Sequence, residues 1–115
     1  MIKISYDNVM NSLNKGLNIK LICWNRDQAN WLFNRVCDLW FIKNFSQANR
    51  NSLTLMYGPD KLKIQCCGLN RMVNKDLRGF QGVYMIHPDI HPDNVTYSEH
   101  QIIRECTHHN ERYLE

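Results

Sequence analysis

The sequence predicts a small single α/β domain over residues 1–115, in which three helices flank a mixed sheet of two parallel strands plus a β-hairpin. Three segments have apolar residues every three or four positions, which is typical of helices, and four others have short or alternating apolar stretches, which is typical of strands. These segments follow one another in the order helix, strand, helix, hairpin, strand, helix, and this alternation favours parallel strands joined across a helix.

The first two elements are short. Residues 6–15 place apolar side chains on one side of a predicted helix, and Gly16 is a natural stop for it. Residues 19–24 form an apolar run with β-branched members, which predicts a strand buried on at least one face.

The segment 26–44 predicts a long helix. Asn25 is a suitable N-cap, and Gln28 lies three residues later, where its side chain can complete a capping box. The predicted core-facing stripe consists of Ala29, Leu32, Phe33, Val36, Leu39 and Trp40. Trp31 and Phe41 fall outside this stripe. They indicate either a helix that the core almost envelops or a helix whose far side is a protein interface.

The rest of the chain begins with a polar segment, residues 46–51, that predicts a loop. Alternating apolar residues then predict a β-hairpin with strands 53–57 and 62–66, one face buried and the other wetter. Residues 68–81 predict a second polar loop, and the continuous apolar run 82–86 predicts a buried strand.

A last helix is predicted over roughly 97–113. The segment Thr96-Tyr97-Ser98-Glu99 has the pattern of a capping box, with Thr96 as the N-cap. Ile102, Cys106 and Tyr113 belong to its predicted core side.

Composition favours a cytoplasmic protein. The chain has no apolar stretch of about 18 residues and no signal-peptide pattern. Its five cysteines, an odd number, fit a reducing compartment better than a disulfide framework. The abundance of asparagine is typical of an AT-rich genome such as that of a phage, in which case the expected location is the host cytoplasm.

The formal net charge of +3 permits nucleic-acid binding without requiring it, because the chain lacks a dense run of Lys and Arg. Arg71, Lys75 and Arg78 lie in the loop before the last strand, and Phe80 beside them is available to stack on a base. A solvated surface explains these residues equally well.

Histidine and cysteine gather in the last third of the chain. His87, His91, Cys106 and His109 form the best candidate zinc site, since zinc prefers about four nitrogen and sulfur ligands. The alternative is a sheet-end turn, made by the repeated His-Pro-Asp, followed by a helix with a solvated polar stripe at residues 100, 104 and 108.

Three segments together resemble parts of a phage terminase or helicase-type P-loop ATPase domain. Residues 18–40, which read NIKLICWNRDQANWLFNRVCDLW, resemble the second strand and following helix of those domains, including the Gln-Ala pair that opens the helix. Residues 53–70, LTLMYGPDKLKIQCCGLN, resemble the hairpin that follows. Residues 77–89, LRGFQGVYMIHPD, resemble the segment that ends in the Walker B acids.

The chain departs from this family at the positions that carry its chemistry. It has no G-x-x-x-x-G-K-[ST] sequence to hold phosphates. His87 and Pro88 stand where the Walker B acids belong, and Asp89 comes two positions late. Without the phosphate loop, its lysine and the metal-binding carboxylates, ATP hydrolysis is not expected and no residue is assigned a catalytic role. Residual nucleotide binding is a further alternative.

The sequence therefore predicts a non-catalytic, phage-type binding protein without a cofactor, which engages or inhibits a host protein through a degenerate ATPase-like scaffold. The residues predicted to contact the partner are Trp31, Phe41, Arg71, Lys75, Arg78, Phe80, His87 and Asp89. The alternative is a zinc-binding or nucleic-acid-binding protein that uses the His/Cys cluster and the basic loop 71–80.

Overall fold

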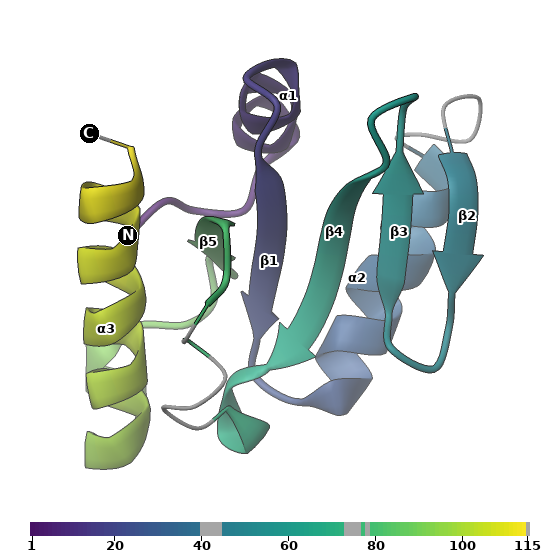
Figure 1. The fold of residues 1–115 in the computed structure, drawn as a ribbon. Helices are drawn as coiled ribbons and strands as arrows, with labels where there is room; N and C mark the ends of the chain where they lie inside the picture. Colours follow the sequence, from purple (N-terminus) through teal and green to yellow (C-terminus); the bar gives the residue numbers. More distant parts are fainter. Residues whose placement is uncertain (40–44, 73–76, 78, 115) are drawn as a thin grey trace.

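The computed structural model describes residues 1–39, 45–72, 77 and 79–114, which form three α-helices and one mixed sheet of five strands (Figure 1). The elements are α1 (Tyr6–Asn14), β1 (Asn18–Cys23), α2 (Arg26–Leu39), β2 (Phe45–Asn49), β3 (Thr54–Tyr57), β4 (Leu62–Gly68), the 3-10 turn η1 (Leu69–Arg71), β5 (Gly82–Ile86), the 3-10 turn η3 (Pro92–Asn94) and α3 (Tyr97–Tyr113). The predicted α/β class is confirmed.

The sheet has the strand order β2-β3-β4-β1-β5. Strand β1 runs parallel to both of its neighbours, so that Ile19 lies opposite Ile64 of β4 and Val83 of β5. Strand β3 pairs antiparallel with β2 on one side and with β4 on the other. The predicted parallel pairing of the first and last strands and the predicted hairpin are both confirmed.

The prediction of a loop over residues 46–51 was wrong, because Phe45–Asn49 forms the edge strand β2. This segment is polar and lacks alternating apolar residues, so its strand conformation comes from pairing with β3 and not from its own sequence pattern. The predicted continuation of the second helix to residue 44, which includes Phe41, lies outside the described residues beyond Leu39.

Helices cover the two faces of the sheet unequally. Helices α1 and α2 seal one face, in a core that includes Val9, Phe33, Leu21, Ile64 and Val83. Helix α3 packs on the other face, in a second core that contains Ile22, Tyr84, Ile86, Ile102 and Cys106. Since neighbouring strand residues point to opposite faces, Leu21 and Ile22 mark the two sides. Helix α3 contacts β5, and among the described helices none lies over β2, β3 and β4 on this second face (Figure 1).

The outer edge of β5 is filled by the N-terminal segment and by side chains of α3, Asn110 among them. Ile86 N–H donates to the Ile2 carbonyl (2.9 Å), and Ile4 N–H donates to the Ile86 carbonyl (2.8 Å). The Asn110 side chain accepts from Tyr84 N–H (2.9 Å) and donates to the Tyr84 carbonyl (2.8 Å). These bonds replace a neighbouring strand and fix α3 over one half of the second face.

Helix starts follow the sequence closely. The predicted capping box of α3 is confirmed, since Glu99 N–H donates to Thr96 Oγ1 (3.2 Å) and Thr96 N–H donates to Glu99 Oε1 (2.9 Å). At α2, Asn25 Oδ1 accepts from Gln28 N–H (2.9 Å), as predicted for the N-cap. The predicted capping box is not formed, because the Gln28 side chain accepts from Trp24 N–H (2.7 Å), one residue before the N-cap, and a capping box requires the N–H of Asn25 itself.

Candidate binding site on the open sheet face

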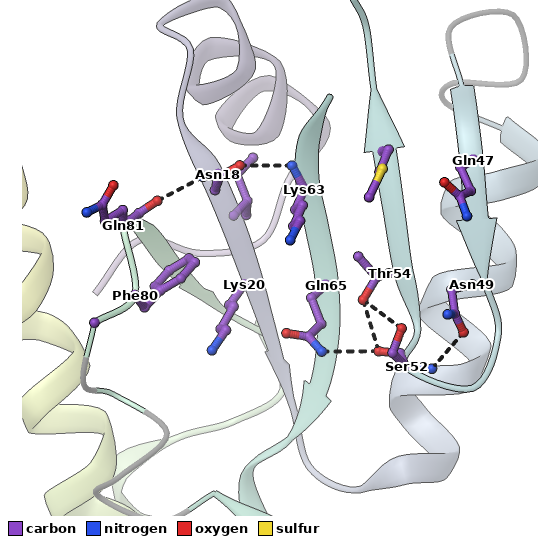
Figure 2. Close-up of a pocket in the computed structure, with 13 residues that line it drawn as sticks. Asn18, Lys20, Gln47, Asn49, Ser52, Thr54, Lys63, Gln65, Phe80 and Gln81 are labelled. Atoms are coloured by element: carbon purple, nitrogen blue, oxygen red, sulfur yellow. Dashed lines mark hydrogen bonds between the residues drawn. The ribbon is translucent and has the colours of Figure 1, made fainter. Parts of the chain in front are cut away.

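The uncovered half of the second sheet face contains a hollow of about 470 Å³, which we call the open face (Figure 2). It extends from the segment before β5 across β1, β4 and β3 to the edge strand β2. The residues that line it are Asn18, Ile19, Lys20, Gln47, Asn49, Ser52, Thr54, Met56, Lys63, Gln65, Gly79, Phe80 and Gln81.

The side chains of the open face come from alternate strand positions. In β4, Ile64 points into the first core, whereas Lys63 and Gln65 on either side of it point into the hollow. In β1, Lys20 lines the hollow, and the residues on either side of it in the sequence, Ile19 and Leu21, belong to the first core. The two-residue period of a strand therefore produces one apolar face and one polar face from the same sequence.

Hydrogen bonds hold the floor of the open face in place (Figure 2). Asn18 Oδ1 accepts from Lys63 N–H (2.9 Å), and Asn18 Nδ2 donates to the Gln81 carbonyl (3.0 Å). Gln65 Nε2 donates to the Ser52 carbonyl (3.2 Å). These bonds connect segments that are far apart in the chain, so the polar groups are arranged before any ligand arrives, which lowers the entropic cost of binding.

Phe80 forms the wall of the open face next to α3. The Lys20 ammonium lies 4.6 Å from the centre of the Phe80 ring, within cation–π distance. The Phe80 ring stacks on His109 (centroids 5.8 Å apart), and His109 stacks on Tyr113 (5.7 Å). His109 Nε2 is also 2.8 Å from the Gly82 carbonyl. This aromatic column supports Phe80 from the α3 side.

Gly82 allows this wall to approach the sheet. A Cβ atom at this position would lie 2.7 Å from Phe80 Cζ and even closer to the Asn18 carbonyl oxygen. Both contacts are too short for any side chain, so only glycine permits this packing of β5 against β1 and Phe80.

The charge of the open face has one sign. Lys20 and Lys63 line it, and none of the described residues around it carries a carboxylate. Five side-chain amides supply both hydrogen-bond donors and acceptors, from Asn18, Gln47, Asn49, Gln65 and Gln81. The arrangement suits an anionic ligand that also presents polar edges.

The residues predicted to contact a partner do not form one surface. Phe80 lies on the open face, and Arg71 lines an adjoining hollow. Trp31 is 58% exposed on α2, which packs on the opposite face of the sheet, and the Arg35 guanidinium lies 5.3 Å from its ring. Lys75, Arg78 and Phe41 lie outside the described residues.

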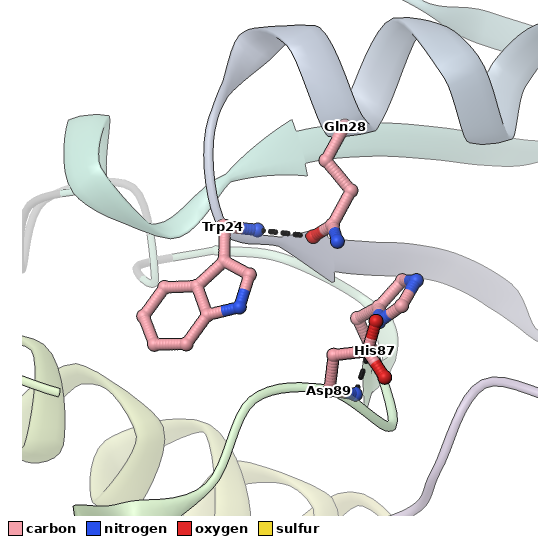
Figure 3. Close-up of polar contacts among 4 residues, drawn as sticks. All are labelled: Trp24, Gln28, His87 and Asp89. Carbon is pink, nitrogen blue, oxygen red and sulfur yellow. Dashed lines mark hydrogen bonds and ion pairs between the residues drawn. The ribbon is translucent and has the colours of Figure 1, made fainter. Parts of the chain in front are cut away.

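His87 and Asp89 lie at the carboxyl end of β5, near Trp24 and Gln28 (Figure 3). His87 Nδ1 accepts from Asp89 N–H (3.1 Å) and is 3.7 Å from Asp89 Oδ2. The His87 carbonyl accepts from Ile90 N–H (3.0 Å). These contacts close a tight turn, as the turn alternative for the His-Pro-Asp repeat predicts.

The four predicted zinc ligands do not come together. Cys106 is buried in the second core, where burial raises the pKa of its thiol to about 12 and so disfavours the thiolate that zinc requires. His109 Nε2 is engaged by the Gly82 carbonyl, and His91 is exposed at the start of η3. Within the described residues, no group of three or more His, Cys, Asp or Glu side chains is placed to hold a metal ion.

Sequence reasoning missed the amide side chains of the open face. The signal that was present is the polar residue at every second position of the hairpin, which predicted a wetter face without indicating what that face does.

Comparison of the chain with protein-family models, with curated proteins and with solved structures found no match. The resemblance to P-loop ATPases therefore stays a prediction. None of the described helices combines the length and the apolar character that crossing a membrane requires. Fold and site together define the class: an α/β domain with one sealed sheet face and one polar, partly open face.

Proposed function

We propose that the protein acts by binding and that its open face takes single-stranded nucleic acid. The observation that carries this proposal is the lining of the open face, where two lysines, five amides and one aromatic ring meet without a carboxylate among the described residues. Proteins that bind single strands combine a positively charged groove with aromatic side chains on which bases stack.

Each part of the lining has a role in this proposal. Lys20 and Lys63 neutralise phosphates, and the amides of residues such as Gln47 and Gln65 pair with the exposed edges of unpaired bases. A base that stacks on Phe80 displaces the Lys20 ammonium from the ring. The ammonium can then interact with a phosphate of the same strand. From β1 to β2 the face spans three strand spacings, about 14 Å, which is room for a few nucleotides.

The same composition argues against a protein partner at this site. The centres of protein–protein interfaces are enriched in aromatic residues and depleted of lysine. The open face has the opposite balance, because two lysines flank its polar floor and Phe80 is the one aromatic residue among those that line it.

Fluorescence anisotropy tests the proposal with a labelled mixed-sequence oligonucleotide, measured as a single strand and as a duplex. The variant Lys63→Gln removes an exposed charge of the open face, and Lys3→Gln removes an exposed lysine outside it. We expect the single strand to bind more tightly than the duplex and Lys63→Gln to weaken binding by up to about 1 kcal/mol, roughly fivefold. Absence of binding at low salt, or equal losses in the two variants, contradicts the proposal.

A second candidate function is binding of a protein, in the host if the chain is phage-encoded, through the outer side of α2. The observation that favours it is Trp31, which is 58% exposed with the Arg35 guanidinium over its ring. Tryptophan and arginine are enriched among the residues that dominate interface energies. This candidate requires that a partner captured from a bacterial lysate by the wild-type protein be lost with Trp31→Ala and kept with Lys63→Gln.

A further inference from the structure

The open face continues into a second hollow of about 380 Å³ at the carboxyl ends of β1 and β4, which we call the basic hollow. The residues that line it are Lys20, Arg26, Ser52, Gln65, Cys66, Cys67, Gly68, Arg71 and Met72. Lys20, Ser52 and Gln65 also line the open face, so the two hollows form one continuous surface.

Three cations from three different elements converge on the basic hollow. Lys20 comes from β1, Arg26 is the first residue of α2, and Arg71 is the last residue of η1. None of the described residues that line the hollow carries a carboxylate. Arg26 and Arg71 both line the hollow, so an anion that entered it would be attracted by two guanidinium groups.

Arg26 is positioned by the turn between β2 and β3. Its Nη2 donates to the carbonyls of Asn51 (2.6 Å) and Arg50 (3.5 Å). Both contacts involve Nη2, and a guanidinium has five N–H donors, so Arg26 can be held by the turn and still present N–H groups to a ligand.

The backbone around Gly68 brings Arg71 to the start of α2. A Cβ atom on Gly68 would lie 2.9 Å from the Asn25 carbonyl carbon and 2.9 Å from Asn70 Oδ1. Asn70 N–H donates to the Trp24 carbonyl (3.3 Å). The end of β4 therefore packs directly against the turn that opens α2, and Arg71 follows three residues after this contact.

We infer that the basic hollow is a phosphate-binding subsite of the open face. This inference rests on the proposed function: a single strand bound across the open face has one phosphate held by Arg26 and Arg71, while a base of the same strand stacks at Phe80. Lys20 lines both hollows and so connects these two points of attachment. The carboxyl ends of parallel strands are the usual ligand-binding edge of α/β sheets, and the amino-terminal end of α2 adds a favourable dipole.

The test compares Arg71→Gln with Arg104→Gln, since both arginines are exposed and Arg104 lies on α3 away from both hollows. One measurement follows the backbone amide signals of Gly68 and Arg71 by NMR during addition of inorganic phosphate, with chloride at equal ionic strength as the control. The other measures the affinity of the labelled single strand against salt concentration, using the full chain.

We expect phosphate to shift the Gly68 and residue 71 signals in the wild-type protein and in Arg104→Gln, and to leave them unmoved in Arg71→Gln. We also expect Arg71→Gln to lower the affinity for the single strand about tenfold. The slope of log K against log salt concentration should fall in magnitude by about 1. If Arg71→Gln has the same affinity and salt slope as Arg104→Gln, the phosphate subsite is overturned and the proposed function is left intact. Phosphate shifts without any binding of the oligonucleotide support the phosphate site and overturn the proposed function.

Discussion

Asn110 is the residue that ties α3 to the sheet. It is 6% exposed, and its amide pairs with both the N–H and the carbonyl of Tyr84. Asn110→Ala leaves the buried N–H and the buried carbonyl of Tyr84 without their hydrogen-bond partners. Since each buried polar group left without a partner costs about 1–3 kcal/mol, we expect the free energy of unfolding to fall by about 2–6 kcal/mol.

Urea denaturation followed by circular dichroism measures this change. Asn11→Ala is the matched control, because Asn11 is exposed on α1. A loss in Asn110→Ala no larger than in this control would show that the Asn110 amide does not contribute to holding α3 on the sheet.

Phe80 supplies the aromatic surface of the open face, so its substitution tests stacking directly. Phe80→Leu keeps most of the apolar volume and loses the ring. Because stacking of one base on an aromatic side chain is worth about 1–3 kcal/mol, we expect the affinity for the single strand to fall by about tenfold or more. Tyr97→Ala is the control, since Tyr97 is 81% exposed at the start of α3 and does not line the open face. Equal affinities in the two variants would remove Phe80 from the binding site.

At the scale of elements, the contact between β5 and β1 depends on Gly82. Gly82→Ala places a Cβ against the Asn18 carbonyl and Phe80 Cζ, and the backbone carbonyl cannot move without breaking the sheet. We expect a loss of stability of about 1–3 kcal/mol, which is typical of overpacking. Chemical denaturation measures it, with exposed Ser98→Ala on α3 as the control. A variant as stable as this control would show that β5 can shift without cost.

The elements with strong apolar periodicity were predictable from the sequence, and those held by pairing were not. Helices α1 and α3 and strands β1, β3, β4 and β5 follow their apolar patterns closely. Strand β2 was missed because its polar residues become a strand only by pairing with β3.

The candidate site was predictable only in part. Phe80 and Arg71 were identified as a basic and aromatic group, and both lie at the two joined hollows. The amide side chains of the open face were missed, because a polar residue at every second position predicts only that a sheet face is exposed. Whether that face forms a hollow depends on where α3 docks. That docking depends on Asn110, whose burial no polar pattern in the sequence reveals.

At the scale of the whole molecule, the net charge of +3 conceals an uneven distribution. Four cations, Lys20, Lys63, Arg26 and Arg71, line the two joined hollows, and none of the described residues that line those hollows is acidic. Among the described residues, acidic side chains occur on other elements, for example Asp7 in α1 and Glu99 in α3. A chain of weak overall charge can therefore present a surface that attracts polyanions.

The buried cysteines make the stability of the whole fold sensitive to alkaline pH. Burial, with a smaller contribution from Cys67, raises the thiol pKa of Cys23 and that of Cys106 to about 12, and burial raises the pKa of Cys66 well above its ordinary value. In the unfolded chain these thiols lose their protons near pH 9. The folded state thus holds protons that the unfolded state releases, so stability is full below pH 9 and falls as the pH rises from 9 towards 12.

Cys106→Ala tests this origin of the pH dependence, because each thiol contributes a loss of about 1.4 kcal/mol per pH unit in that range. Removing the sulfur lowers stability at every pH, but we expect the further loss between pH 9 and 10.5 to be about 2 kcal/mol smaller than in the wild-type protein. Ile102→Val is the matched control, since it truncates a residue of the same core that does not titrate. Urea denaturation at a series of pH values measures both variants, and the titration of lysine and tyrosine cancels in the comparison. An identical pH slope in Cys106→Ala and Ile102→Val would mean that the Cys106 thiol does not keep its proton in the folded state.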